Sequence, residues 1–212
     1  MHEKEWALAL ASVSFAAVSL LLQAAVSWGG GRKDTSARAG SPLRGVFYNF
    51  TAAMSPRHKE TTRLHPVKFA VGVAMHLGIL AAIAKLVLLI VDPGFESWRS
   101  VALGSALGVA ALCGLTLLVR RFLSATLRGI SSFDDYVSVL LVIGFLALAA
   151  LEELGVVGRP AFFVTSAALF FYLPLGKLRH ALFFFVARAD YGRRLGHRGV
   201  YPPKCGGVPP HA

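Results

Sequence analysis

The feature that most constrains this chain is a series of five apolar stretches, each close to the length of a membrane-spanning helix. About 20 residues at 1.5 Å per residue cross the hydrocarbon core of a bilayer. The stretches cover residues 6–28, 67–91, 101–119, 136–154 and 161–186. None of them alternates apolar and polar residues as a membrane β-strand does. The sequence therefore predicts an all-α integral membrane bundle of five transmembrane helices.

Composition supports this class of protein and excludes most cysteine chemistry. Of the 212 residues, 55% are hydrophobic and only 16% are charged. The mean hydropathy is +0.60, above what the surface of a soluble domain carries. Cys113 and Cys205 are too few for a disulfide framework, a zinc site built from cysteines or an iron–sulfur cluster, and no C-x-x-C-H motif for covalent haem attachment occurs.

A cleaved signal peptide is the competing explanation for the first apolar stretch. The preceding residues 2–5 (HEKE) are not basic, and the apolar run is longer than the core of a signal peptide. Trp6 and Trp28 stand at its two ends, where an interfacial aromatic belt is expected. We interpret the stretch as a retained helix.

Basic residues are concentrated in alternate connections between the stretches. Residues 29–68, 120–135 and 177–212 hold 18 of the 22 Lys and Arg, whereas the amino terminus and the other two connections hold one each. Because Lys and Arg near helix ends stay on the cytoplasmic side, we expect the amino terminus outside and the carboxyl terminus in the cytoplasm. The net charge of +11 then reflects topology and contact with anionic lipids, and nucleic-acid binding is not expected.

Two segments outside the spans have a character of their own. Residues 43–54 (LRGVFYNFTAAM) form an amphipathic piece that we expect to lie on the membrane surface. Residues 200–212 are rich in Pro and Gly and predict an irregular tail. The remainder, residues 1–199, is predicted to form one membrane domain.

Two of the seven histidines, His76 and His180, fall inside apolar stretches, and an ionisable residue at membrane depth suggests function. His76 lies nine residues into a helix that enters from the cytoplasm, about 13 Å deep. His180 lies six residues before a helix returns there, about 9 Å from its end. Both imidazoles thus belong to one leaflet and suit the two axial ligands of a b-type haem between helices. Polar packing between helices and a proton or ion path are the alternatives.

Small and basic residues accompany both histidines. Gly72 and Gly176 each precede their histidine by four residues, which on a helix leaves a patch without a side chain one turn away, where a flat macrocycle has room. The cations expected at the cytoplasmic ends are Lys68, Arg120, Arg121, Lys177 and Arg179. Such side chains can reach haem propionates as well as lipid phosphates.

The residues around the two histidines resemble a known family. Residues 65–80 (HPVKFAVGVAMHLGIL) and 171–185 (FYLPLGKLRHALFFF) resemble the membrane cytochrome b family of the respiratory nitrate reductase gamma subunit. That family includes membrane subunits of heterodisulfide-reductase-like and sulfite-reductase-associated complexes. The resemblance implies that His76 and His180 ligate haem iron. It also implies electron transfer between the quinone pool and a ferredoxin-type iron–sulfur subunit on the cytoplasmic side of a prokaryotic inner membrane.

The family pattern includes a second haem, whose ligand positions fall at Leu86 and Phe162 in this sequence. Neither side chain ligates iron, so we expect a single haem b. The family's quinone site lies beside that second haem and does not transfer to this chain. The quinone candidates are Lys85 and His65. The alternatives for Lys85 are to snorkel to the interface or to donate to another buried group, and the alternative for His65 is an interfacial cap or a lipid contact.

These observations predict the haem b membrane subunit of a respiratory oxidoreductase complex rather than a stand-alone enzyme, because no segment resembles a substrate-reducing site. A separate catalytic subunit and an exchangeable quinone complete the expected partners. A haem-free membrane anchor, with both histidines in packing roles, is the alternative from another class. A small transporter is a third class, but the first and third stretches are almost wholly apolar and offer no polar pathway.

Overall fold

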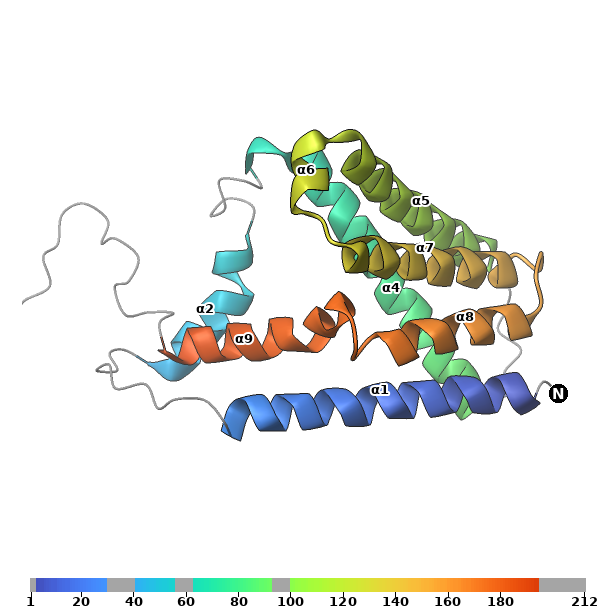
Figure 1. Ribbon diagram of the computed structural model, residues 1–212, viewed down its shortest axis with the longest axis horizontal. Helices are drawn as coiled ribbons and strands as arrows, with labels where there is room; N and C mark the ends of the chain where they lie inside the picture. The colour runs from blue at the N-terminus through green and yellow to red at the C-terminus, as the bar shows by residue number, and fades with distance from the viewer. Residues whose placement is uncertain (1–2, 30–40, 56–62, 93–99, 195–212) are drawn as a thin grey trace, which may run out of the picture. The chain divides into compact units, whose positions relative to one another are not determined.

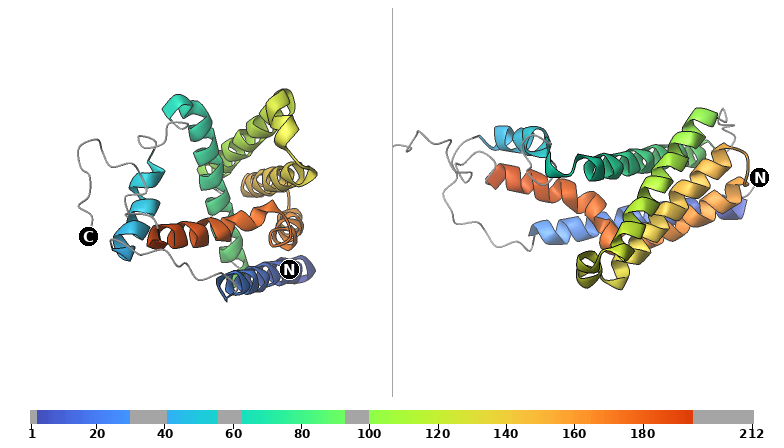
Figure 2. Two further views of the ribbon diagram at one scale, coloured as in Figure 1. Left: turned by 60° about the vertical axis from the view of Figure 1, so that its left-hand side comes forward. Right: turned by 90° about the horizontal axis from the view of Figure 1, so that it is seen from above.

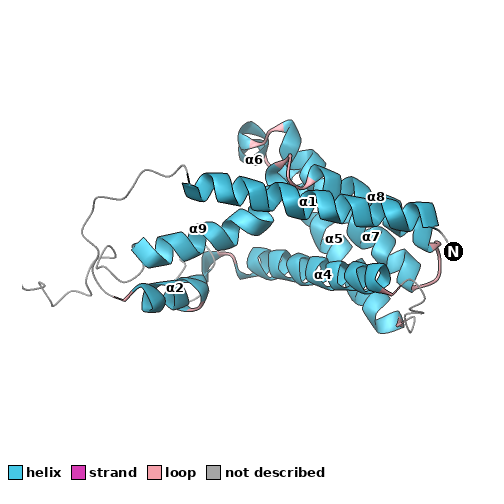
Figure 3. Cartoon of the chain, turned by 90° about the horizontal axis from the view of Figure 1, so that it is seen from below, coloured by secondary structure: helices cyan, strands magenta, loops and turns pink. Residues whose placement is uncertain are grey.

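The computed structural model describes residues 3–29, 41–55, 63–92 and 100–194 (Figure 1). Within these ranges the chain is helical and contains no strand (Figure 3), so the predicted all-α fold is confirmed. The helices are α1 (Glu3–Gly29), α2 (Pro42–Phe50), α4 (Pro66–Val91), α5 (Val101–Leu123), α6 (Ala125–Ile130), α7 (Phe133–Glu153), α8 (Arg159–Tyr172) and α9 (His180–Arg194), with the 3-10 turns η1 (Ala52–Met54) and η3 (Lys177–Arg179).

Four of these helices, α1, α4, α5 and α7, are each long and apolar enough to cross a membrane. A fifth candidate consists of α8 and α9, if the two count as one span. By length and composition the chain is therefore a multi-pass membrane protein.

The chain divides into two compact units. Unit 1 comprises residues 1–23 and 67–179, and unit 2 comprises residues 24–66 and 180–212. The helices from α4 to α8 and most of α1 fall in unit 1, whereas α2 and α9 fall in unit 2.

Unit 1 is a bundle in which α5 and α7 lie side by side and antiparallel (Figures 1 and 2). At one end of the pair, Gly104 of α5 packs against Leu154, the residue that follows α7. At the other end, Arg121 of α5 lies 3.4 Å from Asp135 of α7. The short connection between the two helices therefore reverses the chain, as expected for neighbouring spans.

Small residues bring the helices of unit 1 close together. A Cβ added at Gly78 of α4 would lie 2.2 Å from the Cβ of Ala110 of α5, too close for two carbon atoms. Because apolar helices in lipid gain little from hydrophobic burial against each other, close van der Waals contact at small residues contributes much of their association. The fully buried rings of Phe145 and Phe162, with centroids 5.5 Å apart, fill the core between α7 and α8.

The start of α7 lies three residues earlier than predicted, at Phe133. Ser132 is the N-cap, and its backbone N–H donates to the Asp135 carboxylate at 2.8 Å. Asp134 and Asp135 both lie in the first turn, where the helix dipole favours negative charge. The cap and the two carboxylates together explain why the helix begins before the apolar run does.

The fifth predicted span is not one continuous helix. It consists of α8, which ends at Tyr172, and α9, which begins at His180, with a break between them. Pro174 lies in the break; proline has no N–H, and inside a helix its ring clashes with the carbonyl four residues earlier. Pro174 is fully buried. Its carbonyl accepts a hydrogen bond of 3.0 Å from Nε2 of Gln23 on α1.

Unit 2 is built on the pair α2 and α9. A Cβ added at Gly192 of α9 would lie 2.7 Å from the carbonyl oxygen of Gly45 of α2, so the two backbones cross in direct contact. The buried Asn49 donates to that same carbonyl at 3.0 Å, and Arg188 of α9 donates to the Asn49 carbonyl at 2.8 Å. These contacts commit one face of α2 to α9.

The amphipathic piece predicted over 43–54 corresponds to α2 and η1. The predicted irregular tail, residues 200–212, lies outside the described residues.

Candidate functional site

His76 lies on α4 with an exposed side chain. Its Nδ1 is 2.7 Å from the carbonyl oxygen of Gly72, one turn earlier on the same helix. Since a carbonyl only accepts, this hydrogen bond places the proton of a neutral imidazole on Nδ1. The lone pair is then on Nε2, the nitrogen that would ligate a metal ion.

The face of α4 around His76 is open and apolar. A Cβ added at Gly72 would meet no atom within 4 Å. The neighbouring side chains of Val73, Leu77 and Leu80 are 40%, 61% and 64% exposed. Among the described residues, none lies within 4 Å of a Cβ added at Gly72, so the helix surface expected beside His76 is open there.

His180 is the first residue of α9, and its side chain is exposed. It belongs to unit 2, whereas His76 belongs to unit 1. The two histidines thus lie in different units, and their pairing stays a prediction.

The patch expected at Gly176 is not open. Gly176 lies in the break that follows α8, and the 3-10 turn η3 separates it from His180, so the two residues are not one turn apart on one α-helix. A Cβ added at Gly176 would lie 2.4–2.7 Å from ring atoms of Tyr172. Gly176 is thus needed for a close contact with Tyr172, and the reasoning that placed a free surface there fails because it assumed a continuous helix.

The break that follows α8 is held by contacts with the start of α7. The backbone N–H of Lys177 donates to the Asp134 carboxylate at 2.9 Å, and the Tyr172 hydroxyl donates to the Asp134 carbonyl at 3.4 Å. The Lys177 ammonium contacts the Asp135 carboxylate at 2.5 Å. These contacts tie the turn immediately before His180 to α7.

Of the five cations predicted near haem propionates, Lys68 has an exposed side chain on α4, and the other four divide into two pairs. Arg121 donates to the Ser131 hydroxyl at 2.8 Å and lies 3.4 Å from Asp135, the same carboxylate that Lys177 contacts. Arg120 and Arg179 have exposed side chains. The structure thus gives Arg121 and Lys177 a role in joining α5, α7 and η3.

A second group of charges, which the sequence reasoning did not assemble, lies at the opposite end of unit 1. We call it the charge cluster: Lys85, Glu152, Glu153 and Arg159. The Lys85 ammonium, 5% exposed, forms ion pairs with both glutamates at the end of α7. Arg159 Nε lies 3.4 Å from Glu152, and the backbone N–H of Ser100 donates to Glu153 at 2.9 Å.

The charge cluster balances two cations with two anions. Lys85, Glu152 and Glu153 are buried, and Arg159 is half-buried. The Lys85 ammonium also lies 5.8 Å from the centre of the Phe162 ring, which adds a cation–π contact. Buried charges are tolerated when they are paired and hydrogen-bonded. The sequence contained a signal for this cluster, because Lys85 and Glu152–Glu153 lie near the ends of two spans that run in the same direction.

The quinone candidates lie in different surroundings. Lys85 neither snorkels to a lipid interface nor stands alone, since two carboxylates receive its ammonium group. His65 is exposed immediately before α4. Quinone contact by either residue stays a prediction.

Leu86 and Phe162, at the positions where the resemblance would place ligands of a second haem, are fully buried in the hydrophobic core. Phe162 stacks on Phe145 and has Phe163 as a further ring neighbour. Packed side chains thus occupy the interior of unit 1 at both positions.

Among the described residues, no group of three or more His, Cys, Asp or Glu is arranged to hold a metal ion. A haem does not require such a group, because the porphyrin supplies four of the iron ligands and the protein only the axial ones.

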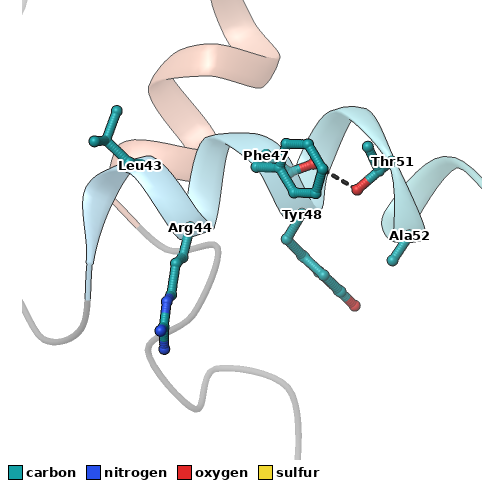
Figure 4. A pocket seen from close by; sticks show the side chains of 6 residues that line it. All are labelled: Leu43, Arg44, Phe47, Tyr48, Thr51 and Ala52. Carbon is teal, nitrogen blue, oxygen red and sulfur yellow. Dashed lines mark hydrogen bonds between the residues drawn. The ribbon is translucent and has the colours of Figure 1, made fainter.

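A shallow apolar pocket opens on α2 and the residues that follow it (Figure 4). Its lining comprises Leu43, Arg44, Phe47, Tyr48, Thr51 and Ala52. It lies entirely in unit 2.

The chain matches no protein-family model, no curated protein and no solved structure.

Proposed function

We propose that this chain is the haem b membrane subunit of a respiratory oxidoreductase complex, transferring electrons between the quinone pool and a cytoplasmic-side iron–sulfur subunit. One observation carries the proposal. His76 lies near the middle of the 26-residue apolar helix α4, with its Nδ1 hydrogen-bonded to the carbonyl of Gly72 and its side chain on an uncovered face.

An imidazole held in this way fits the ligation of haem iron. Histidines that ligate metals usually donate their other ring N–H to a carbonyl or carboxylate, which fixes the tautomer and raises the basicity of the ligating nitrogen. His76 already makes that contact with Gly72. It lies ten residues after Pro66, about 15 Å along the helix axis. At such a depth an ionisable side chain is costly and is a functional candidate by default.

We propose His180 as the second axial ligand, on the resemblance of residues 171–185 to the cytochrome b family. When bound, haem b supplies one-electron transfer at a potential set by its axial ligands and surroundings. The chain would hold the two imidazoles and surround the group with apolar side chains. Arg120 and Arg179, which are exposed, are the better candidates for propionate contacts than the paired Arg121 and Lys177.

Packing in the outer half of unit 1 supports a single haem. Leu86 and Phe162 are fully buried and leave no imidazole at the positions that a second haem would use. Electrons would therefore enter and leave through one centre near His76.

The charge distribution supports the proposed location. Arg120, Arg121 and Lys177 lie at the end of unit 1 where α5 ends and α7 begins, and the balanced charge cluster lies at the other end. By the positive-inside rule the first end faces the cytoplasm. The proposed setting is a prokaryotic inner membrane, with the basic end towards the iron–sulfur and catalytic subunits.

The test is a dithionite-reduced minus oxidised spectrum with pyridine-haemochrome quantitation on the purified protein. We expect about one haem b per chain, because the chain offers one pair of axial ligands. His76→Ala and His180→Ala should each abolish it. His65→Ala is the matched control: it removes an exposed histidine outside the proposed ligand pair and should leave the haem in place.

Three outcomes would contradict the proposal. Loss of haem in His65→Ala would mean that the ligand pair is misassigned, and two haems per chain would mean that ligands were missed. A well-folded native protein without haem would favour the alternative hypothesis, a haem-free membrane anchor.

A further inference from the structure

One face of the helix α2 packs against α9, and the other face is not covered by any residue that the structure describes. On the committed side, Gly45 and Asn49 are buried against α9. On the opposite side, Leu43 is 83% exposed and Phe47 is 71% exposed. Leu43 and Phe47 are four residues apart and so lie on one face, one turn from each other.

The uncovered face of α2 has apolar side chains on one side and polar side chains on the other. Arg44 and Tyr48 extend to one side of the helix, and Leu43 extends to the other (Figure 4). The helix therefore presents a two-residue apolar ridge with a guanidinium and a phenol along one edge. This is the arrangement of a helix that lies in the plane of a membrane surface, with its apolar residues in the acyl boundary and its basic residue at the headgroups.

Charge around α2 favours an anionic surface. The connection that contains it, residues 29–68, carries eight Lys and Arg against two acidic residues, Asp34 and Glu60. The chain on both sides of this connection, α1 and α4, is long and apolar enough to cross a membrane. α2 is thus tethered between two candidate spans.

The size of the exposed ridge distinguishes a lipid surface from a protein partner. A stable protein interface buries about 800 Å² on each partner, whereas two large side chains of this kind supply about 400 Å² at most. Insertion into lipid needs no such area, because each side chain gains from burial on its own.

We propose that α2 lies in the interfacial region of an anionic bilayer, with Leu43 and Phe47 inserted and Arg44 at the lipid phosphates. This inference does not rest on the proposed haem. It concerns a different unit of the chain and holds or fails independently.

The test uses spin labels on the full-length protein in nanodiscs. The background lacks native cysteines (Cys113→Ala, Cys205→Ser). Three separate variants, Leu43→Cys, Phe47→Cys and Tyr48→Cys, each carry one nitroxide on the new cysteine. Accessibility to oxygen, which concentrates in lipid, is compared with accessibility to a water-soluble nickel chelate. We expect a several-fold higher oxygen-to-nickel ratio at 43 and 47 than at 48, the control on the polar edge of the same helix.

Two results would overturn the insertion of this face. High nickel accessibility at 43 and 47 would place the ridge in water. Low accessibility to both probes, or spin–spin broadening at 47, would place a protein surface on it, either a partner or a second copy of this chain.

A second arm tests the role of Arg44. With the label at 47, we expect a deeper position in nanodiscs rich in phosphatidylglycerol than in pure phosphatidylcholine, and we expect Arg44→Gln to remove that difference. Equal depth in both lipids for the native arginine would overturn the assignment of Arg44 to lipid phosphates.

Discussion

At the scale of single residues, Lys85 shows how much a buried charge depends on its partners. Lys85→Met would leave Glu152 and Glu153 without the cation they share, and we expect it to lower the free energy of unfolding by about 3–5 kcal/mol. Thermal unfolding in detergent measures the effect. Lys68→Met is the matched control, since Lys68 is an exposed lysine on the same helix and its loss should change stability by about 0.5 kcal/mol or less.

A double variant separates loss of charge balance from loss of packing at Lys85. Lys85→Met combined with Glu153→Gln leaves Glu152 beside Arg159, so the cluster is neutral again. We expect this variant to recover part of the lost stability, because no buried charge is left uncompensated. If the double variant is no more stable than Lys85→Met, the ion pairs do not account for the effect.

Gly72 makes a residue-scale prediction that separates function from stability. Gly72→Leu places a side chain in open space, so we expect the free energy of unfolding to change by about 0.5 kcal/mol or less. We expect the haem content to fall, because the new side chain occupies the helix face beside His76. Gly108→Leu is the matched control: Gly108 of α5 also has nothing within 4 Å and does not adjoin either histidine in sequence. Loss of haem in both variants, or in neither, would contradict the assignment of this face.

At the scale of elements, the break between α8 and α9 depends on Gly176, because the Tyr172 ring packs directly against it. Gly176→Ala forces a Cβ into the Tyr172 ring, and overpacking of this kind costs about 1–3 kcal/mol. We expect a lower thermal unfolding temperature for Gly176→Ala. Adding Tyr172→Ala should relieve the clash, so that Gly176→Ala becomes harmless in that background. A full-size effect in both backgrounds would mean that the ring is not the obstacle.

At the scale of the whole molecule, the prediction concerns the direction of the chain in the membrane. The basic connections alternate with weakly charged ones, so we expect the carboxyl terminus in the cytoplasm and the amino terminus outside. A green fluorescent protein fused after Ala212 should fluoresce, and alkaline phosphatase fused there should be inactive. The reverse pattern would overturn the orientation and move the proposed partners to the other side.

Much of this molecule could be read from its sequence, because spans are set by local properties. The length and apolarity of a stretch decide whether it crosses a bilayer, and the limits of α4 differ from the predicted 67–91 by one residue. The depth of His76 follows from counting along one helix. The break at Pro174 also left a sequence signal, and the expectation of a continuous helix gave it too little weight.

The contacts that give these residues their roles came only with the tertiary structure, because the partners are far apart in the chain. Lys85 contacts Glu152 and Glu153 across more than sixty residues, and Gln23 donates to the Pro174 carbonyl across 151 residues. Spacing identified Gly72 and Gly176 as equivalent, yet one adjoins open space and the other a tyrosine ring. Periodicity describes one helix at a time, whereas the use of a helix face depends on which other helix packs against it.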